Sequence, residues 1–152
     1  MPENVEPRLL GIGAEAPDFT LVASDGTPVT LSEFRGRSNV CLFFYPQDET
    51  AGCTRQLGAA RDDRERFIAK DVERFGVNPG SLESHRRFVE KAGLDFPLLV
   101  DADLEVARSY GAARPGDRRV WRTVYLIDKA GEVAFAARGC PTTDEILGAL
   151  DR

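Results

Sequence analysis

The residues best suited to chemistry lie within residues 46–54, where a cysteine stands at the expected start of a helix. In the first turn of a helix, Cys53 would be close to the positive end of the helix dipole and to unpaired backbone N–H groups, and both favour the thiolate over the thiol. Thr50 can direct its hydroxyl at the sulfur or at a molecule held beside it. Pro46 can exclude water without adding a hydrogen-bond donor. This spacing predicts a nucleophilic cysteine that attacks a small polar electrophile.

The remaining reactive side chains suggest no second site. Cys41 and Cys140 form no CxxC pair with Cys53 and supply no second cluster for a zinc site, so neither a metal nor a cofactor is expected. A thioredoxin-type disulfide reductase is disfavoured, because it needs two thiols close together. Cys41 lies in an apolar run and is expected to be a buried small hydrophobe. His85, which two arginines follow, is expected on a solvated helix face.

The elements that must position Cys53 can be predicted from apolar spacing and turn residues. Residues 40–45 are apolar at every position, which is typical of a strand covered on both faces of an α/β sheet. From Gly52 to about Lys70 the apolar residues recur near helical spacing, so we predict one long helix there. Residues 18–22 and 28–31 flank the turn pair Asp25-Gly26 and predict a hairpin, after which Ser32 is expected to cap a helix.

The rest of the chain predicts alternating strands and helices. Strands are expected at 72–77 and 98–100, a helix between Ser81 and Gly93, a helix at 104–110, and a hairpin of 120–127 with 133–137. Thr142 and Glu145 have capping-box spacing before a final helix. Together these elements predict one mixed-sheet α/β domain at residues 13–152, preceded by a loose segment at residues 1–12.

Composition limits the possible partners. The chain has 152 residues, of which 42% are hydrophobic, enough for a core without disulfides or metal. Its net charge of −5 disfavours nucleic acid as a partner, and its longest apolar run, residues 40–45, is too short to cross a membrane. Residues 1–10 do not have the pattern of a signal peptide, so a soluble protein in the cytoplasm is expected.

The spacing Pro-x-x-x-Thr-x-x-Cys resembles the signature of the peroxiredoxins, and further segments resemble that family in the same order. They are residues 16–21, 40–46, 96–101, 109–111 and 122–128, and the resemblance covers about residues 13–150. The chain is most similar to the bacterioferritin comigratory protein group, or Q class, of the AhpC/TSA superfamily. This resemblance implies a thioredoxin-like fold with an N-terminal β-hairpin extension and a central mixed sheet flanked by helices.

The resemblance also implies an activity and a role for each site residue. Cys53 would be the peroxidatic cysteine, whose thiolate reduces hydrogen peroxide or an organic hydroperoxide and becomes a sulfenic acid. Arg122 would stabilise the thiolate and the developing charge, Thr50 would hold the peroxide, and Pro46 would shield the site. The reductant would be a thioredoxin-like protein or a low-molecular-weight thiol. The chain would act as a monomer or a homodimer.

Three departures from the family pattern affect this transfer. Ala51 stands where the group usually has proline, and Gln56 stands where a glutamate is usual, so the carboxylate link to the arginine is expected to be lost. Gly58 occupies the position of the usual resolving cysteine. Cys140, after the last predicted strand, resembles the resolving cysteine of atypical two-cysteine peroxiredoxins, and an external thiol is the alternative. A non-enzymatic redox sensor or chaperone on the same fold is the alternative function.

Overall fold

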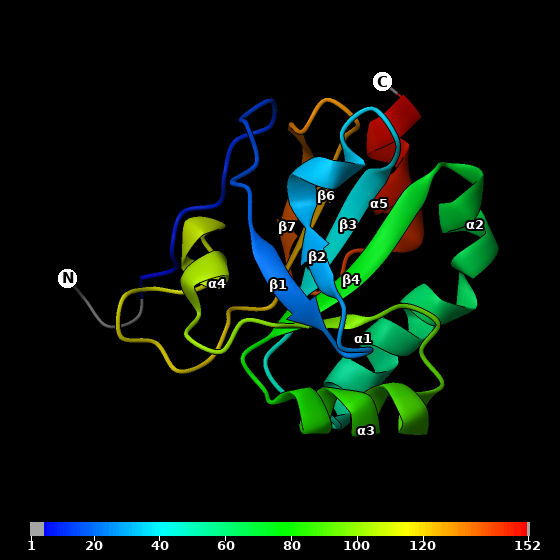
Figure 1. The fold of residues 1–152 in the computed structure, drawn as a ribbon. Helices are drawn as coiled ribbons and strands as arrows, with labels where there is room; N and C mark the ends of the chain where they lie inside the picture. Colours follow the sequence, from blue (N-terminus) through cyan, green and yellow to red (C-terminus); the bar gives the residue numbers. More distant parts are fainter. Residues whose placement is uncertain (1–4, 152) are drawn as a thin grey trace.

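A seven-stranded mixed sheet forms the centre of the computed structural model, which describes residues 5–151 (Figure 1). The strand order is β2-β1-β5-β4-β3-β6-β7. The strands are β1 (Thr20–Ala23), β2 (Pro28–Thr30), β3 (Asn39–Phe44), β4 (Val72–Asn78), β5 (Leu98–Val100), β6 (Thr123–Ile127) and β7 (Val133–Arg138). The helices are α1 (Ala51–Asp62), α2 (Arg64–Ala69), α3 (Leu82–Ala92), α4 (Glu105–Ser109) and α5 (Thr143–Gly148), with short 3-10 helices η1 (Leu31–Phe34) and η2 (Ala149–Asp151).

Strand β3 lies at the middle of the sheet, as its apolar sequence predicts. It is parallel to β4 and antiparallel to β6, and all six of its residues are buried. Side chains of β3 alternate between two core clusters. Leu42 and Phe44 join the cluster beneath α4, whereas Cys41 and Phe43 join the cluster that receives α1, α2, α3 and α5. This arrangement confirms the predicted mixed α/β architecture with helices on both faces of the sheet.

Several predicted ends of elements are confirmed by their capping interactions. The Ser81 hydroxyl accepts a hydrogen bond from Ser84 N at the start of α3, and Gly93 ends that helix with a φ of 61°. Thr142 and Glu145 form the predicted capping box of α5. The hairpin of β1 and β2 also forms around the predicted turn.

The prediction of one long helix from Gly52 to Lys70 is wrong. Asp63 (φ −90°, ψ 19°) separates α1 from α2, and its carboxylate accepts a hydrogen bond from the Thr143 hydroxyl of α5. Phe67 of α2 is fully buried in the core cluster of this face, so tertiary packing overrides the continuous helical pattern. Ser32 is likewise not a cap, because it lies inside η1, whose capping position is Thr30.

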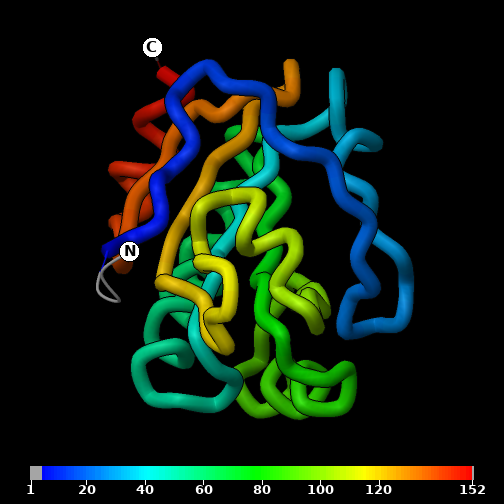
Figure 2. Tube along the Cα trace, turned by 90° about the vertical axis from the view of Figure 1, so that its left-hand side faces the viewer, coloured from blue at the N-terminus to red at the C-terminus, as the bar shows by residue number. Residues whose placement is uncertain are grey.

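The segment before the first hairpin lies against the edge of the sheet. Figure 2 shows this segment, in blue, beside the orange β6–β7 hairpin, and the Gly13 N–H donates to the Val133 carbonyl at 2.8 Å. Leu10 N donates to the Tyr125 hydroxyl at 3.0 Å. Of the segment expected to be loose, residues 1–4 lie outside the described residues. No helix within residues 5–151 is long and apolar enough to cross a membrane.

Candidate active site

Cys53 occupies the third position of α1, directly after the loop that leaves the central strand. Strand β3 ends at Phe44, and α1 begins at Ala51. The first helical hydrogen bond runs from Thr54 N to the Thr50 carbonyl (2.9 Å), so the amides of residues 51–53 have no carbonyl partner within the helix. The Cys53 side chain is fully buried in the core cluster beneath α1. The sulfur therefore lies at the electropositive end of a twelve-residue helix, as predicted.

Sheet register brings Arg122 to this sulfur from 69 residues away. Thr123, the first residue of β6, pairs with Phe44, the last residue of β3, so the residue before β6 lies beside the loop after β3. Arg122 Nη2 donates to Cys53 Sγ at 3.3 Å. A guanidinium at this distance favours the negative charge of a thiolate.

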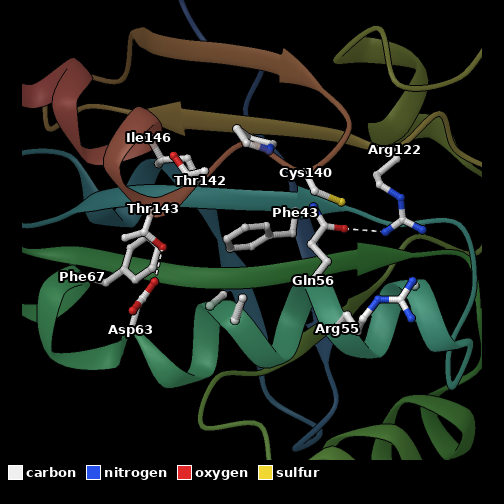
Figure 3. Close-up of a pocket in the computed structure, with 14 residues that line it drawn as sticks. Phe43, Arg55, Gln56, Asp63, Phe67, Arg122, Cys140, Thr142, Thr143 and Ile146 are labelled. Atoms are coloured by element: carbon white, nitrogen blue, oxygen red, sulfur yellow. Dashed lines mark hydrogen bonds between the residues drawn. The ribbon is translucent and has the colours of Figure 1, made fainter.

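Gln56 connects Arg122 to the segment that follows β7. Its Oε1 accepts from Arg122 Nη1 at 2.5 Å (Figure 3). Its Nε2 donates to the Gly139 carbonyl at 3.4 Å. Gly139 N in turn donates to the Arg122 carbonyl at 2.9 Å. The expected loss of the link at this position applies only to its charge, because the amide oxygen of Gln56 still accepts from the guanidinium. The arginine is thus fixed in orientation, and no carboxylate neutralises it at this point.

Thr50 and Pro46 lie in the loop of residues 45–50, and both are half-buried. The Thr50 hydroxyl donates to the Gln47 carbonyl at 3.2 Å. The Thr50 carbonyl accepts from both Thr54 N and the Thr54 hydroxyl, the latter at 2.7 Å, so the backbone of Thr50 is fixed to the start of α1. Pro46 follows the buried Tyr45 at the end of the strand. Their predicted roles toward a peroxide remain predictions.

Cys140 is exposed and lines a cavity of about 630 Å³ between α1 and the connection from β7 to α5. Figure 3 shows Cys140 beside Gln56 and Arg122 at one end of this cavity, with Phe43 and Phe67 along its floor. Gly52, the residue before Cys53, also lines it. Gly139 has a φ of 80°, a conformation that glycine tolerates best, and this turn places Cys140 at the cavity.

Cys41 is fully buried, as predicted for a small hydrophobe in the central strand. Burial raises the pKa of its thiol far above the ordinary value, although the positive charge of Arg74 acts in the opposite direction. A thiol in this state is a poor nucleophile.

The prediction that His85 lies on a solvated helix face is wrong. Its side chain is fully buried on the face of α3 that also carries Phe88, three residues later, and its Nδ1 lies 2.6 Å from Asp48 Oδ2. The helical spacing of His85 and Phe88 was the available signal, and the two following arginines obscured it. Asp48 was not predicted as a site residue, because two of its partners, Ser84 and His85, become its neighbours only in the folded chain. Within residues 5–151, no three His, Cys, Asp or Glu side chains gather as a metal site.

The sequence of the chain is similar to a known protein family over the segments that form this site. The AhpC/TSA family model matches residues 12–136, a range that holds Cys53, Arg122 and the whole central strand. The chain belongs to the AhpC/TSA family. Within it, the chain is 41% identical over 124 residues to Peroxiredoxin Q, chloroplastic, of Sedum lineare, covering 80% of this chain and 65% of that protein. It is 36% identical over 148 residues to Peroxiredoxin Bcp of Bacillus subtilis, covering 91% of this chain and 92% of that protein.

A solved structure of the family shares the whole fold. Peroxidoxin BcpB from Mycobacterium tuberculosis superimposes with a TM-score of 0.82 at 31% identity, covering 92% of this chain and 94% of that one. The thioredoxin-like fold predicted from the resemblance is therefore confirmed. The chain spans about two thirds or less of the length of the plant relatives that it matches.

Proposed function

We propose that this chain is a thiol-dependent peroxidase that reduces hydrogen peroxide and organic hydroperoxides through Cys53. The observation that carries the proposal is the contact of 3.3 Å between the Arg122 guanidinium and the Cys53 sulfur at the start of α1. The peroxiredoxin names of the two relatives support it. The alternative of a redox sensor or chaperone places the same reactive thiol on the same fold, but it does not require turnover.

The chemistry follows from the charges around the sulfur. The Cys53 thiolate attacks one oxygen of the hydroperoxide, an S–O bond forms, and the O–O bond breaks. The departing oxygen takes a proton from water and leaves as water or an alcohol, while the sulfur becomes a sulfenic acid. Negative charge moves from sulfur to the departing oxygen, and both positions are stabilised by Arg122 and the first-turn amides of α1. For Thr50 to hold the peroxide, its hydroxyl must turn away from Gln47, while Pro46 keeps water out.

Cys140 is the residue we assign to resolution. Its thiol would attack the Cys53 sulfenic acid, form a disulfide and release water. Cys140 lines the same cavity as Gly52 and Arg122, whereas Cys41 is enclosed in the sheet. Because Cys53 is fully buried, the first turn of α1 must unwind before the two sulfurs can meet. Direct attack by an external thiol is the alternative.

This assignment predicts the product of a single oxidation. After one equivalent of hydrogen peroxide without reductant, mass spectrometry should find a Cys53–Cys140 disulfide within the monomer. Cys140→Ser should instead accumulate oxygen on Cys53, and Cys41→Ser should still form the disulfide. Oxygen on Cys53 of the unmodified chain, with Cys140 still free to alkylate, would assign resolution to an external thiol.

Repeated turnover tests the activity itself. With a thioredoxin-like protein or a low-molecular-weight thiol in excess, one mole of protein should consume many moles of peroxide. Consumption that stops at one equivalent under every such reductant would favour the sensor.

We place this chemistry in a reducing compartment such as the cytoplasm, where an external thiol pool restores Cys53. Monomer and homodimer are both compatible with a site built within one chain.

A further inference from the structure

A buried polar cluster lies on the side of the loop of residues 45–50 that faces α3. It consists of Tyr45, Asp48, Asn78, Ser84 and His85, and we call it the Asp48 cluster. The Asp48 carboxylate is at its centre and accepts three hydrogen bonds, from the Tyr45 hydroxyl (2.6 Å), the Ser84 hydroxyl (2.7 Å) and His85 Nδ1 (2.6 Å). Only 6% of the Asp48 side chain is exposed, although the residue belongs to a loop. Such complete pairing of a buried loop carboxylate indicates a specific role.

The ring of His85 is contacted at both of its nitrogens. Its Nδ1 faces the Asp48 carboxylate, and its Nε2 faces the carbonyls of Asn78 (3.2 Å) and Leu99 (3.1 Å). Both ring nitrogens therefore lie against oxygen atoms, and these contacts fix the orientation of the ring. Burial acts to raise the pKa of Asp48, but the hydrogen bonds from His85, Tyr45 and Ser84 hold it below its ordinary value. The loop and α3 are therefore joined by the buried contact between the Asp48 carboxylate and His85 Nδ1.

The same cluster closes back onto the strand that precedes the loop. Asn78 Nδ2 donates to the Tyr45 carbonyl at 2.8 Å, and Asn78 Oδ1 accepts from Gly80 N at 2.7 Å. A Cβ at Gly80 would lie 2.8 Å from Asn78 Oδ1 and 3.1 Å from Asp48 Oδ2, so the turn before α3 packs against the carboxylate. The loop that follows β3 is thus held at Tyr45 and at Asp48 by residues at and just after the carboxyl end of β4.

The loop needs this anchor because its own conformation is unfavourable. Glu49, the next residue, has a φ of 61° in the left-handed region, which costs free energy for a residue with a Cβ. Its carboxylate pairs with Lys91 Nζ of α3 at 2.8 Å, an exposed pair that contributes little. The next two residues are Thr50 and the first residue of α1. Figure 1 shows α1 and α3 side by side at this end of the sheet.

We propose that Asp48 is a positioning residue for Cys53, which, by binding Ser84 and His85 of α3, holds the loop of residues 45–50 and the first turn of α1 in the conformation that reacts with peroxide. Tyr45 belongs both to the Asp48 cluster and to the buried core cluster that contains Cys53. The role of this anchor in catalysis rests on the proposed peroxidase function. Release of the anchor lets the first turn of α1 unwind, which lowers the rate of oxidation but not the rate of resolution.

The test compares Asp48→Asn with a matched control in the full chain. Asparagine keeps the shape of the side chain but lacks the charge opposite His85. Asp95→Asn is the control, because Asp95 Oδ2 pairs with Nη2 of the buried Arg74 at 2.5 Å near the start of β4, away from the loop. Ser84→Ala removes a single hydrogen bond to Asp48 and gives a milder variant that keeps the contact with His85.

Hydrogen exchange and the rate of reaction with peroxide are measured for each variant, starting from the reduced protein. Hydrogen exchange of peptides covering residues 45–56 should be about tenfold faster in Asp48→Asn, with a smaller increase in Ser84→Ala and none specific to this segment in Asp95→Asn. The second-order rate constant for oxidation of Cys53 by hydrogen peroxide should fall about tenfold in Asp48→Asn alone, while resolution of its sulfenic acid is not slowed. A general loss of stability is not expected to slow oxidation while leaving resolution unslowed.

The proposal is overturned if Asp48→Asn keeps either the native exchange rate or the native oxidation rate, or if Asp95→Asn changes both as strongly. If the unmodified chain does not react with peroxide, the proposed function fails instead. The exchange data then still decide whether Asp48 anchors the loop.

Discussion

Replacement of Cys53 by serine is expected to abolish peroxide consumption, with a loss of at least about a thousandfold. The serine hydroxyl would also lie at the start of α1, where Arg122 contacts the native sulfur, but it remains protonated and is a far weaker nucleophile. The measurement is the consumption of hydrogen peroxide with an excess of thiol reductant.

Cys41→Ser is the matched control for that loss. Cys41 is also fully buried, so its replacement places a hydroxyl in the apolar core and should cost about 1–3 kcal/mol of folding free energy. Its effect should therefore fall on thermal stability and not on the rate with peroxide. Activity retained in Cys53→Ser, or lost only in Cys41→Ser, would show that the nucleophile is wrongly assigned.

Arg122→Lys is expected to lower the rate of oxidation about a hundredfold, although the positive charge is kept. The guanidinium uses Nη2 for the sulfur and Nη1 for Gln56, and an ammonium group cannot make both contacts in one plane. Rapid-quench alkylation of Cys53 after mixing with peroxide measures this rate. Arg119→Lys, at an exposed arginine of the preceding loop, is the control and should react at the native rate. Equal rates for both variants would remove Arg122 from the mechanism.

Local patterns predicted much of the fold because they reflect local energetics. The apolar run of β3, the Ser81 and Gly93 ends of α3 and the capping box of α5 each depend on residues within one element or its ends. The break at Asp63 was not predictable in this way. It depends on α5, 80 residues later, and on the burial of Phe67, neither of which alters the helical spacing of the sequence.

Only part of the candidate site could likewise be predicted from the sequence. The environment of Cys53 at a helix start could be derived from its own neighbours, because the dipole and free amides are properties of the helix. The pairing with Arg122 came only through the family resemblance, since register in the sheet brings the two together. The Asp48 cluster was missed altogether. A histidine followed by two arginines suggests a solvated surface, and Asp48 precedes His85 by 37 residues.

Differential alkylation measures whether the Cys53 sulfur is the atom that peroxide oxidises. The reduced chain is mixed with one equivalent of hydrogen peroxide for a few seconds, quenched in denaturant with an alkylating agent, and mapped by peptide mass spectrometry. We expect Cys53 to lose alkylation in proportion to the peroxide consumed, while Cys41 remains fully alkylated. Peroxide consumed with Cys53 still fully alkylated would contradict it.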